Sequence, residues 1–405
     1  MIITQGHSTK GTGLGPRRLR RGRSQRVRRD ATPDHDLTIA GPVVWGDGLG
    51  RICPSLYMAL YKLVKTKIYH MQINDPNLQS SLPTYIQKHN LLTAESLSNK
   101  KQVAKHLIFT GLQDIGSGHQ YEFNRYIDAI RLAKDYRGAI TMLEGTKIPQ
   151  SWVRSLNNNF TEALVPAEYL IDIYKSCDVK IPVIHMPLVM IDMSELLSRD
   201  SHKHNEEKPF TFGILSGGWT RKMVAETAQV FIKTFPISSH RHLKLRIHCR
   251  FGDASEMEKI HRIATTDPRI HYTCGVVNEP DVQIIKDSFD CYLSASCGEG
   301  FSFTPREFLA RGVPSIISSG HAHTPIIENE GAIGVKISHM RPAFYGYFGH
   351  LGEEWVPDMN DLAEKMLDVY NNYDSHCEDV ATVRENLAIY GPEILGNKIV
   401  QHIFT

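Results

Sequence analysis

Short apolar runs alternate with longer amphipathic stretches along most of the chain after residue 36. Residues 210–216, 242–250 and 291–295 have the length and composition of buried strands, and a segment with helical periodicity follows each run. Strands that alternate with helices in this way are typical of parallel sheets covered by helices. The pattern therefore predicts an α/β protein.

Length and one polar interval divide this pattern into two domains. The chain has 405 residues, whereas an ordinary domain contains about 150. Residues 193–209 include a polar, charged and non-periodic run, which is typical of a linker. We therefore expect a disordered Arg-rich tail at 1–36, a first domain at 37–192, a linker at 193–209, a second domain at 210–385, and a C-terminal helix at 386–405 that can cross back to the first domain.

The first part of the chain differs from the rest in charge. Residues 1–29 carry nine Lys or Arg and no acidic residue, whereas the remainder holds 37 basic against 44 acidic residues. A net negative remainder disfavours a body that binds specific nucleic acid. The basic segment is predicted to be disordered. Its functional alternatives are a tether to anionic lipid, a nuclear-type basic signal and an organelle transit segment.

Cysteine usage and hydropathy indicate a cellular compartment. The seven cysteines are scattered, odd in number and never arranged as Cys-x-x-Cys, which suits free thiols in a reducing compartment better than a disulfide framework or a zinc site. No apolar run reaches the roughly 20 residues of a transmembrane helix, and the N-terminus lacks an apolar signal core. We expect a cytoplasmic protein whose basic tail can contact a membrane peripherally.

Residues 291–314 combine a buried strand, a polar loop flanked by glycines, and a helix that begins near Thr304 and stops at Gly312. In an α/β sheet, the carboxyl end of a strand and the helix N-terminus that follows it are where anionic ligands bind. Glu299 and Glu307 bracket this loop. Glu307 also fits a capping box with Thr304, whereas no local structural role explains Glu299.

The stretch from Glu299 to Pro314 reads Glu-Gly-Phe-x-x-x-Pro-x-Glu-x-x-Ala-x-Gly-x-Pro. It resembles the donor-site signature of retaining glycosyltransferases of the GT-B type, in the sucrose-synthase-like family 4. The resemblance is strong over about residues 210–340 and fair over 37–190. It implies two Rossmann-like domains whose parallel sheets face an interdomain cleft. It also implies a hexosyltransferase that moves a sugar from a nucleotide-diphosphate-sugar donor to a glycan, lipid or other hydroxyl acceptor, with retention of anomeric configuration and no essential metal.

The resemblance implies roles for individual residues. Glu307 would bind the ribose of the donor and Glu299 the transferred sugar. The amides of Phe301 and Ser302 would hold the diphosphate together with Lys222. The implied catalytic residues are Glu299, Lys222 and Glu144, and the implied donor-binding residues are Glu307, Arg221, Phe301, Ser302, Gly298, Gly300, Gly48, Gly50, Arg51, Val277 and Arg250.

Departures from the family pattern leave alternatives open. Many family members have a histidine where Glu144 stands, and Glu144 could orient the acceptor hydroxyl, line the sugar pocket or only cap a helix. Ile214 follows Gly213 in place of the first of two expected cations, and Arg221 would substitute for it. The alternative hypotheses are a GT-B nucleotide-sugar epimerase, a glycogen-phosphorylase-like enzyme, and a degenerate transferase core that acts as a binding protein through its basic tail.

The glycine-rich segment from residue 46 to Arg51 follows the first predicted strand. The resemblance makes it a loop that closes over the diphosphate, and the alternative is a tight turn. It does not match the Gly-x-Gly-x-x-Gly fingerprint of NAD sites.

Several histidines and one Asp-x-Asp are further candidates, for the acceptor side of the site or for a metal site. His70 and His119 are secondary candidates for the acceptor side. His321 and His323 are spaced like metal ligands, but no third ligand lies nearby in the sequence, which favours a surface turn. Residues 34–36 hold the only Asp-x-Asp, at the edge of the tail, which disfavours a metal-dependent GT-A transferase.

Overall fold

The computed structural model describes residues 33–43, 48–70, 103–111, 126–345 and 349–405. Pro33–Thr405 form one compact unit. Most of the predicted tail lies outside the described residues, but its last four residues belong to the compact unit. His35 is buried, and its Nε2 lies 2.9 Å from Oγ1 of Thr38. Residues 33–36, which the sequence analysis assigns to the tail, are therefore part of the compact unit.

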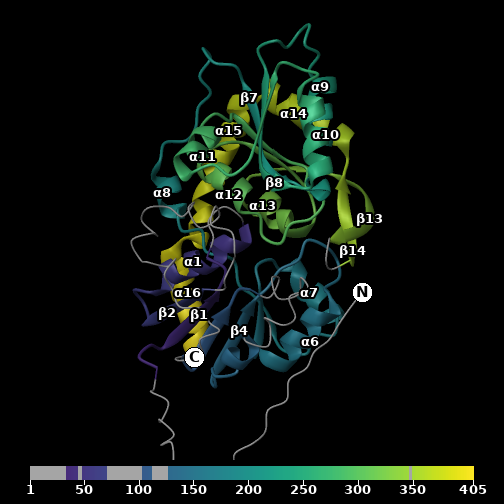
Figure 1. The fold of residues 1–405 in the computed structure, drawn as a ribbon. Coiled ribbons are helices and arrows are strands. Elements are labelled where there is room, and N and C mark those ends of the chain that lie inside the picture. The colour runs from purple at the N-terminus through teal and green to yellow at the C-terminus, as the bar shows by residue number, and fades with distance from the viewer. Residues whose placement is uncertain (1–32, 44–47, 71–102, 112–125, 346–348) are drawn as a thin grey trace, which may run out of the picture. The chain divides into compact units, whose positions relative to one another are not determined.

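Six parallel strands form the first sheet, in the order β2-β1-β3-β4-β5-β6. The strands are β1 (Leu37–Gly41), β2 (Thr66–His70), β3 (His106–Phe109), β4 (Tyr136–Ile140), β5 (Glu162–Val165) and β6 (Val183–His185), and the helices of this part include α1 (Gly48–Leu60), α6 (Gln150–Asn159) and α7 (Tyr169–Ser176). The strands are mostly apolar and buried, as expected for a parallel sheet covered by helices (Figure 1).

The segment after β1 differs from its prediction. The sequence predicts a glycine turn before a helix that starts near Ile52, whereas α1 already begins at Gly48. Gly48, Gly50 and Arg51 therefore lie on the first turns of a helix. The preceding residues 44–47 lie outside the described part of the chain. The predicted helix at 121–136 is described only from residue 126, and residues 126–130 are helical.

Six parallel strands form the second sheet, in the order β12-β11-β10-β7-β8-β9. The strands are β7 (Thr211–Gly218), β8 (Lys244–Gly252), β9 (Ile270–Cys274), β10 (Cys291–Ser294), β11 (Ser315–Ser318) and β12 (Ile333–Val335). The helices of this part are η3 (Thr220–Lys222), α9 (Val224–Thr234), α10 (Ala254–Ala264), α11 (Glu279–Lys286), α12 (Phe303–Ala310), η4 (His321–His323), α13 (Thr324–Asn329) and α14 (Met359–Asn371). This is the doubly wound order, which reverses between β7 and β10. Ligands of such sheets bind at the carboxyl ends of the strands beside the reversal.

The segments predicted as linker and C-terminal helix are both partly helical. The predicted linker begins with α8 (Met193–Ser198), whose Met193 and Leu196 are buried. The last part of the chain forms α15 (Tyr373–Val383), η6 (Arg384–Tyr390) and α16 (Pro392–Phe404). Helix α16 lies against α1 of the first domain (Figure 1), where a Cβ on Gly396 would come within 2.7 Å of the Ala59 carbonyl oxygen.

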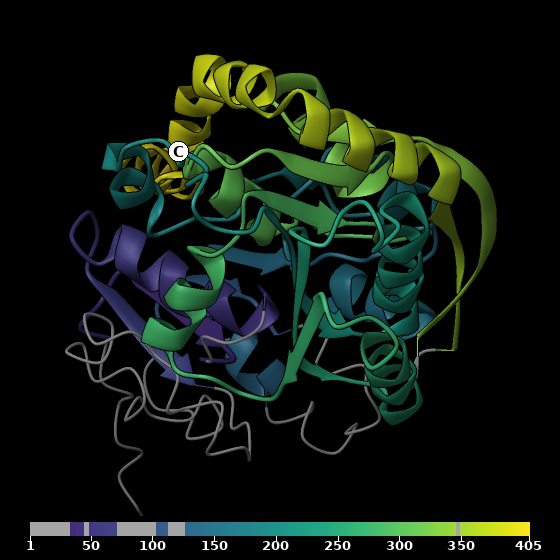
Figure 2. The same ribbon diagram turned by 90° about the horizontal axis from the view of Figure 1, so that it is seen from above.

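An antiparallel hairpin stands apart from both sheets. It consists of β13 (Ile337–Tyr345) and β14 (Gly349–Pro357), and it forms the right-hand edge of the view in Figure 2. The sequence analysis did not predict it, because most of its residues are polar or exposed and Pro342 interrupts the apolar pattern. The hairpin reaches the first domain. The Lys147 amide donates to the Leu351 carbonyl at 3.2 Å, and the Glu353 amide donates to Thr146 Oγ1 at 2.8 Å.

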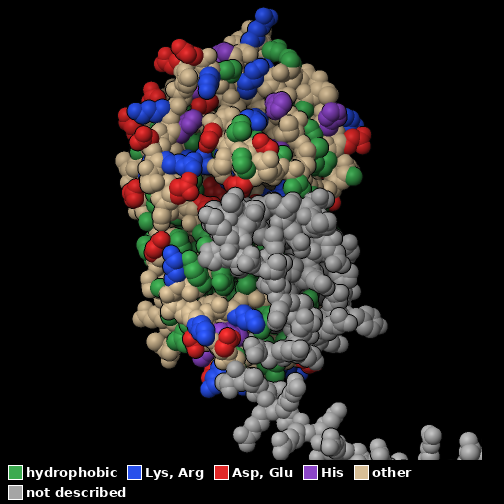
Figure 3. Space-filling model, turned by 60° about the vertical axis from the view of Figure 1, so that its left-hand side comes forward, with side chains coloured by type: hydrophobic (Ala, Val, Ile, Leu, Met, Phe, Trp, Pro, Cys, Tyr) green, Lys and Arg blue, Asp and Glu red, His purple; other side chains and the backbone are tan. Residues whose placement is uncertain are grey.

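The buried apolar residues form two clusters. The larger cluster fills the first domain and continues around α12 of the second, and the smaller cluster lies between the second sheet and helices such as α9 and α14. Acidic and basic side chains are intermixed over the described surface in Figure 3. Among the described residues, no helix has both the length and the apolar character of a membrane span.

Candidate functional site

A cavity of about 520 Å³ lies at the carboxyl ends of β7 and β10, between the two domains. This volume is in the range of small-molecule sites. Every predicted site residue except Gly298 lines the cavity. The structure thus brings together side chains from α1, η3, β8, the loop after β10 and α12, which are far apart in the sequence.

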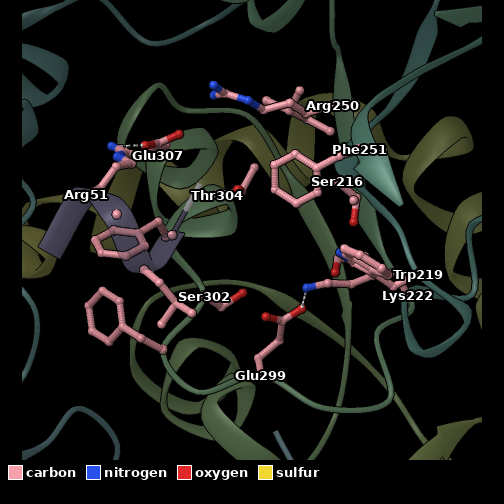
Figure 4. Close-up of a pocket in the computed structure, with 18 of the residues that line it drawn as sticks. Arg51, Ser216, Trp219, Lys222, Arg250, Phe251, Glu299, Ser302, Thr304 and Glu307 are labelled. Atoms are coloured by element: carbon pink, nitrogen blue, oxygen red, sulfur yellow. Dashed lines mark hydrogen bonds and ion pairs between the residues drawn. The ribbon is translucent and has the colours of Figure 1, made fainter. Parts of the chain in front are cut away.

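Glu307 is a cavity residue and not a helix cap. The N-cap of α12 is Ser302, so Thr304 lies in the first turn and the capping-box alternative is wrong. The Glu307 carboxylate instead lies 2.7 Å from Arg51 Nη2 and 2.7 Å from Lys286 Nζ (Figure 4). Burial acts to raise the pKa of Glu307, but the charges of Lys286 and Arg51 outweigh burial and hold the pKa well below its usual range. Glu307 is therefore ionised.

Glu299 forms a second charged centre on another side of the cavity (Figure 4). Lys222 Nζ donates to Glu299 Oε1, and Arg221 Nη1 lies 3.8 Å from the same oxygen. Burial acts to raise the pKa of Glu299, but the charges of Lys222 and Arg221 hold the pKa well below its usual range. The site therefore combines an ionised carboxylate with two cations next to the N-terminus of α12.

Arg221 connects the two domains. Its Nη2 donates to Glu144 Oε1 at 3.0 Å, and its Nη1 donates to the Gly298 carbonyl at 2.7 Å. Gly298 does not line the cavity, and its predicted role in donor binding stays a prediction. It packs against the first domain, where an added Cβ would come within 1.9 Å of the Glu144 carbonyl oxygen. Gly298 thus allows a close approach of two backbones.

The replacement of an expected arginine by Ile214 has a structural explanation. Ile214 lies inside β7 and is buried in the apolar core. The residues of this strand that line the cavity are Leu215, Ser216 and Gly217. Position 214 does not line the cavity, so an isoleucine there does not change the charge of the cavity wall. Arg221 and other cations line the cavity instead.

The turn that holds His321 and His323 is buried, so the predicted surface turn is wrong. His323 Nδ1 donates to the Ser318 carbonyl at 2.9 Å, which leaves Nε2 to accept from Ser302 Oγ, also at 2.9 Å. Burial lowers the pKa of His323 to about 4, so the ring is neutral at neutral pH. Ser302 has a φ of 70°, in the left-handed region, and His323 fixes its side chain at the entrance to α12. Among the described residues, no group of three or more His, Cys, Asp or Glu side chains is placed to hold a metal.

No family model matches the sequence, and no curated protein matches it. Solved structures match its fold. The Anabaena protein HepE in complex with UDP-glucose has a TM-score of 0.64 at 8% identity, over 91% of this chain and 99% of that chain. The trehalose-6-phosphate synthase OtsA has a TM-score of 0.62 at 8% identity, with 91% and 99% covered. TarM has a TM-score of 0.54 at 14% identity, over 76% of this chain and 55% of TarM, so the match spans about half of TarM.

The chain has the GT-B fold. Its two parallel α/β domains match those of these glycosyltransferases, which confirms the predicted fold class. At such low identity the likeness shows the fold alone. The roles of the individual site residues remain predictions.

Several cavity residues of this GT-B chain were missed by sequence reasoning. Lys286 lies at the end of α11, and nothing in the sequence of that helix marks it as a cavity residue. Trp219 and Phe251 line the cavity as an edge-to-face pair with ring centroids 6.0 Å apart (Figure 4). Their position beside Arg221 and Arg250 in the sequence was a weak signal. Of the secondary candidates, His119 and the side chain of His70 lie outside what the structure describes.

Proposed function

We propose that this chain is a retaining hexosyltransferase that moves a sugar from a nucleotide-diphosphate-sugar donor to a hydroxyl acceptor. The observation that carries the proposal is the pair of ionised, cavity-facing carboxylates, Glu299 and Glu307, beside the N-terminus of α12. Carboxylates accept hydrogen bonds from the vicinal hydroxyls of ribose and hexose. A helix N-terminus and nearby cations suit a diphosphate. One cavity thus holds complementary groups for all three parts of such a donor.

The arrangement favours one orientation of the donor. Glu307 would bind the ribose, the amides of Phe301 and Ser302 with Lys222 would bind the diphosphate, and Glu299 would bind the transferred sugar. Structures with the same fold support this proposal, because HepE was solved with UDP-glucose and the pneumococcal transferase GtfA with UDP and GlcNAc. The nucleobase would lie near Val277 and Arg250, which line the same cavity.

The chemistry proposed for the site depends on fixed charge. Lys222 and Arg221 would stabilise the negative charge that develops on the departing diphosphate. That diphosphate would help to deprotonate the acceptor hydroxyl on the same face of the sugar, so the anomeric configuration is retained. Glu144, from the first domain, would orient the acceptor. Contact between the domains would exclude water and limit donor hydrolysis.

Acceptor class and location stay predictions. The acceptor is proposed to be a glycan or a lipid-linked sugar, and the protein to be cytoplasmic with peripheral membrane contact through its basic tail. An epimerase would convert the donor without an acceptor. A binding protein that works through its tail would bind anionic lipid or nucleic acid in a salt-sensitive way and would not need the cavity.

The decisive experiment is donor binding and turnover by the full chain. We expect saturable binding of one UDP-, GDP-, ADP- or TDP-sugar and its transfer to an acceptor pool, with retention seen by NMR of the product. Glu307→Gln should weaken donor binding about 100-fold, because hydrogen bonds to a charged group each contribute about 1.5–3 kcal/mol. Glu299→Gln should reduce transfer more than nucleotide binding.

Glu328→Gln is the matched control, because Glu328 is exposed on α13 and does not line the cavity. It should behave like the wild type. Normal transfer by both cavity variants would refute the site assignment, and epimerised donor without any transfer would identify the alternative enzyme.

A further inference from the structure

Tyr345 brings a phenol hydroxyl from the β13–β14 hairpin to the charged cluster of the cavity. It is the last residue of β13, and its ring lies 5.7 Å from the guanidinium carbon of Arg221. Neighbouring residues of a strand point to opposite faces. Accordingly Phe344 is 73% exposed, whereas Tyr345 faces Arg221. The hairpin thus presents one aromatic side chain to solvent and one to the site.

The Tyr345 hydroxyl is buried and has no hydrogen-bond partner among the described residues. A buried hydroxyl without a partner is unfavourable, and native structures contain few of them. Burial raises the pKa of Tyr345, so the hydroxyl is protonated and able to donate. A phenylalanine would fill the same space without leaving a polar atom unpaired. The described residues therefore supply no hydrogen-bond partner for this hydroxyl, and a bound molecule could provide one.

The neighbours of Tyr345 indicate which substrate could be that partner. The groups suited to the nucleoside and diphosphate line the cavity, whereas Tyr345 is not a lining residue and its ring contacts Arg221, which is one. The hairpin also contacts the first domain, through Lys147 and Leu351. Arg221 currently donates to Glu144. A donor diphosphate would draw Arg221 away and leave Glu144 and the Tyr345 hydroxyl facing the sugar end of the cavity.

We propose that the Tyr345 hydroxyl hydrogen-bonds a sugar hydroxyl of a carbohydrate acceptor, so that the hairpin forms the acceptor wall of the site opposite Glu144. This inference rests on the proposed function. Tyr345 is a binding and specificity residue for the acceptor and has no part in donor binding. A carbohydrate supplies the partner that the buried hydroxyl lacks, because its hydroxyls both donate and accept.

Tyr345→Phe tests the proposal because it removes only the oxygen and keeps the ring against Arg221. The full-length variant is assayed with the preferred nucleotide sugar for donor affinity, for donor hydrolysis without acceptor, and for transfer to an array of oligosaccharides. We expect kcat/KM for the best oligosaccharide to fall about 10-fold, as for loss of one hydrogen bond. Donor affinity and donor hydrolysis should stay at wild-type values, and thermal stability should be unchanged or slightly higher, because the free protein loses an unpaired buried hydroxyl. Phe344→Ala, on the solvent face of the same strand, should leave all four measurements unchanged.

The possible contrary results distinguish failure of the Tyr345 proposal from failure of the proposed function. Unchanged oligosaccharide transfer by Tyr345→Phe overturns the proposal, and so does an equal loss of donor affinity, which would place the hydroxyl on the donor. Wild-type protein that hydrolyses the donor but transfers to no oligosaccharide overturns the carbohydrate assignment. Wild-type protein that neither binds nor consumes any nucleotide sugar refutes the proposed function itself.

Discussion

The close backbone contact between Gly298 and Glu144 makes a sharp prediction about the joining of the two domains. A Cβ at position 298 would lie 1.9 Å from the Glu144 carbonyl oxygen, whereas carbon and oxygen ordinarily approach to about 3.3 Å. In Gly298→Ala the two backbones must therefore separate by about 1.4 Å. A backbone carbonyl cannot rotate aside as the end of a flexible side chain can. The strain therefore falls on the contact between the domains.

The losses of stability and of transfer rate in Gly298→Ala can be estimated from the contacts that this separation disturbs. Overpacking of this kind costs about 1–3 kcal/mol. The separation also stretches the hydrogen bonds from Arg221 to Glu144 and to the Gly298 carbonyl, which are 3.0 and 2.7 Å long. Misplacement of reacting groups by about 1 Å can reduce a rate about 100-fold. We therefore expect Gly298→Ala to stay folded and to lose about 100-fold in kcat/KM for transfer.

Two assays check this prediction, and one of them does not depend on the proposed function. Hydrogen exchange should quicken at the amides of Lys147 and Glu353, whose hydrogen bonds join the hairpin to the first domain. Gly48→Ala is the control for hydrogen exchange only, because its added Cβ would meet the Phe303 ring at 3.7 Å, an ordinary contact distance, whereas its position in the cavity makes it unsuitable as a control for transfer. Wild-type exchange and wild-type transfer in Gly298→Ala would refute the interdomain contact.

Two further predictions concern buried ionisable side chains. Because His323 has a pKa of about 4 when folded and about 6.5 when unfolded, its stabilising contribution is fully present above pH 6.5 and is lost as the pH falls towards 4. About 2 kcal/mol should be lost by about pH 5. Unfolding at neutral and acidic pH measures this, and a His323→Asn variant with equal pH dependence would contradict it. Arg51→Gln should destabilise the chain by less than the about 3–5 kcal/mol expected for an unpaired buried charge, because Lys286 still pairs with Glu307. Thermal unfolding measures the loss. The Arg51→Gln, Glu307→Gln double variant also takes the carboxylate from Lys286, so it should be less stable than Arg51→Gln but should lose less than the sum of the two single variants. Strictly additive losses would show that Arg51 and Glu307 are not coupled.

The sequence predicted those parts of the site that depend on neighbours along the chain. The strand, loop and helix at residues 291–314 follow from a short apolar run, flanking glycines and a helix stop, and Gly312 indeed has a positive φ of 78°. The order of strands and helices likewise predicted two parallel sheets. Local pattern also produced the capping-box alternative for Glu307, because a Thr, Pro and Glu at this spacing satisfy a capping box whether or not a distant arginine is present.

Residues that come from distant segments could not be predicted. Lys286 and Tyr345 reach the site only because α11 and the β13–β14 hairpin fold against it, and no pattern in either segment specifies that contact. The hairpin itself lacks the clean alternation of a half-buried sheet, since residues on both of its faces are exposed. His321 and His323 look like surface residues by composition, and only the fold shows that a loop of polar residues is buried beneath Trp355.

In the proposed function, the ion pairs of the cavity would couple substrate binding to the contact between the domains. Arg51 and Glu307 form one pair across the domains, and Arg221 and Glu144 form another. In the proposed binding mode a ribose would share the Glu307 carboxylate with Arg51, and a diphosphate would compete with Glu144 for Arg221. Each substrate group would therefore weaken a contact that joins the domains and would itself contact both domains. Loss of a single partner leaves a buried charge uncompensated, so alanine at these positions will combine effects on stability and on binding. Glutamine in place of Glu144 or Glu307 removes the charge and keeps the packing of the cavity wall, and double-mutant cycles with variants of the paired arginines separate the two effects.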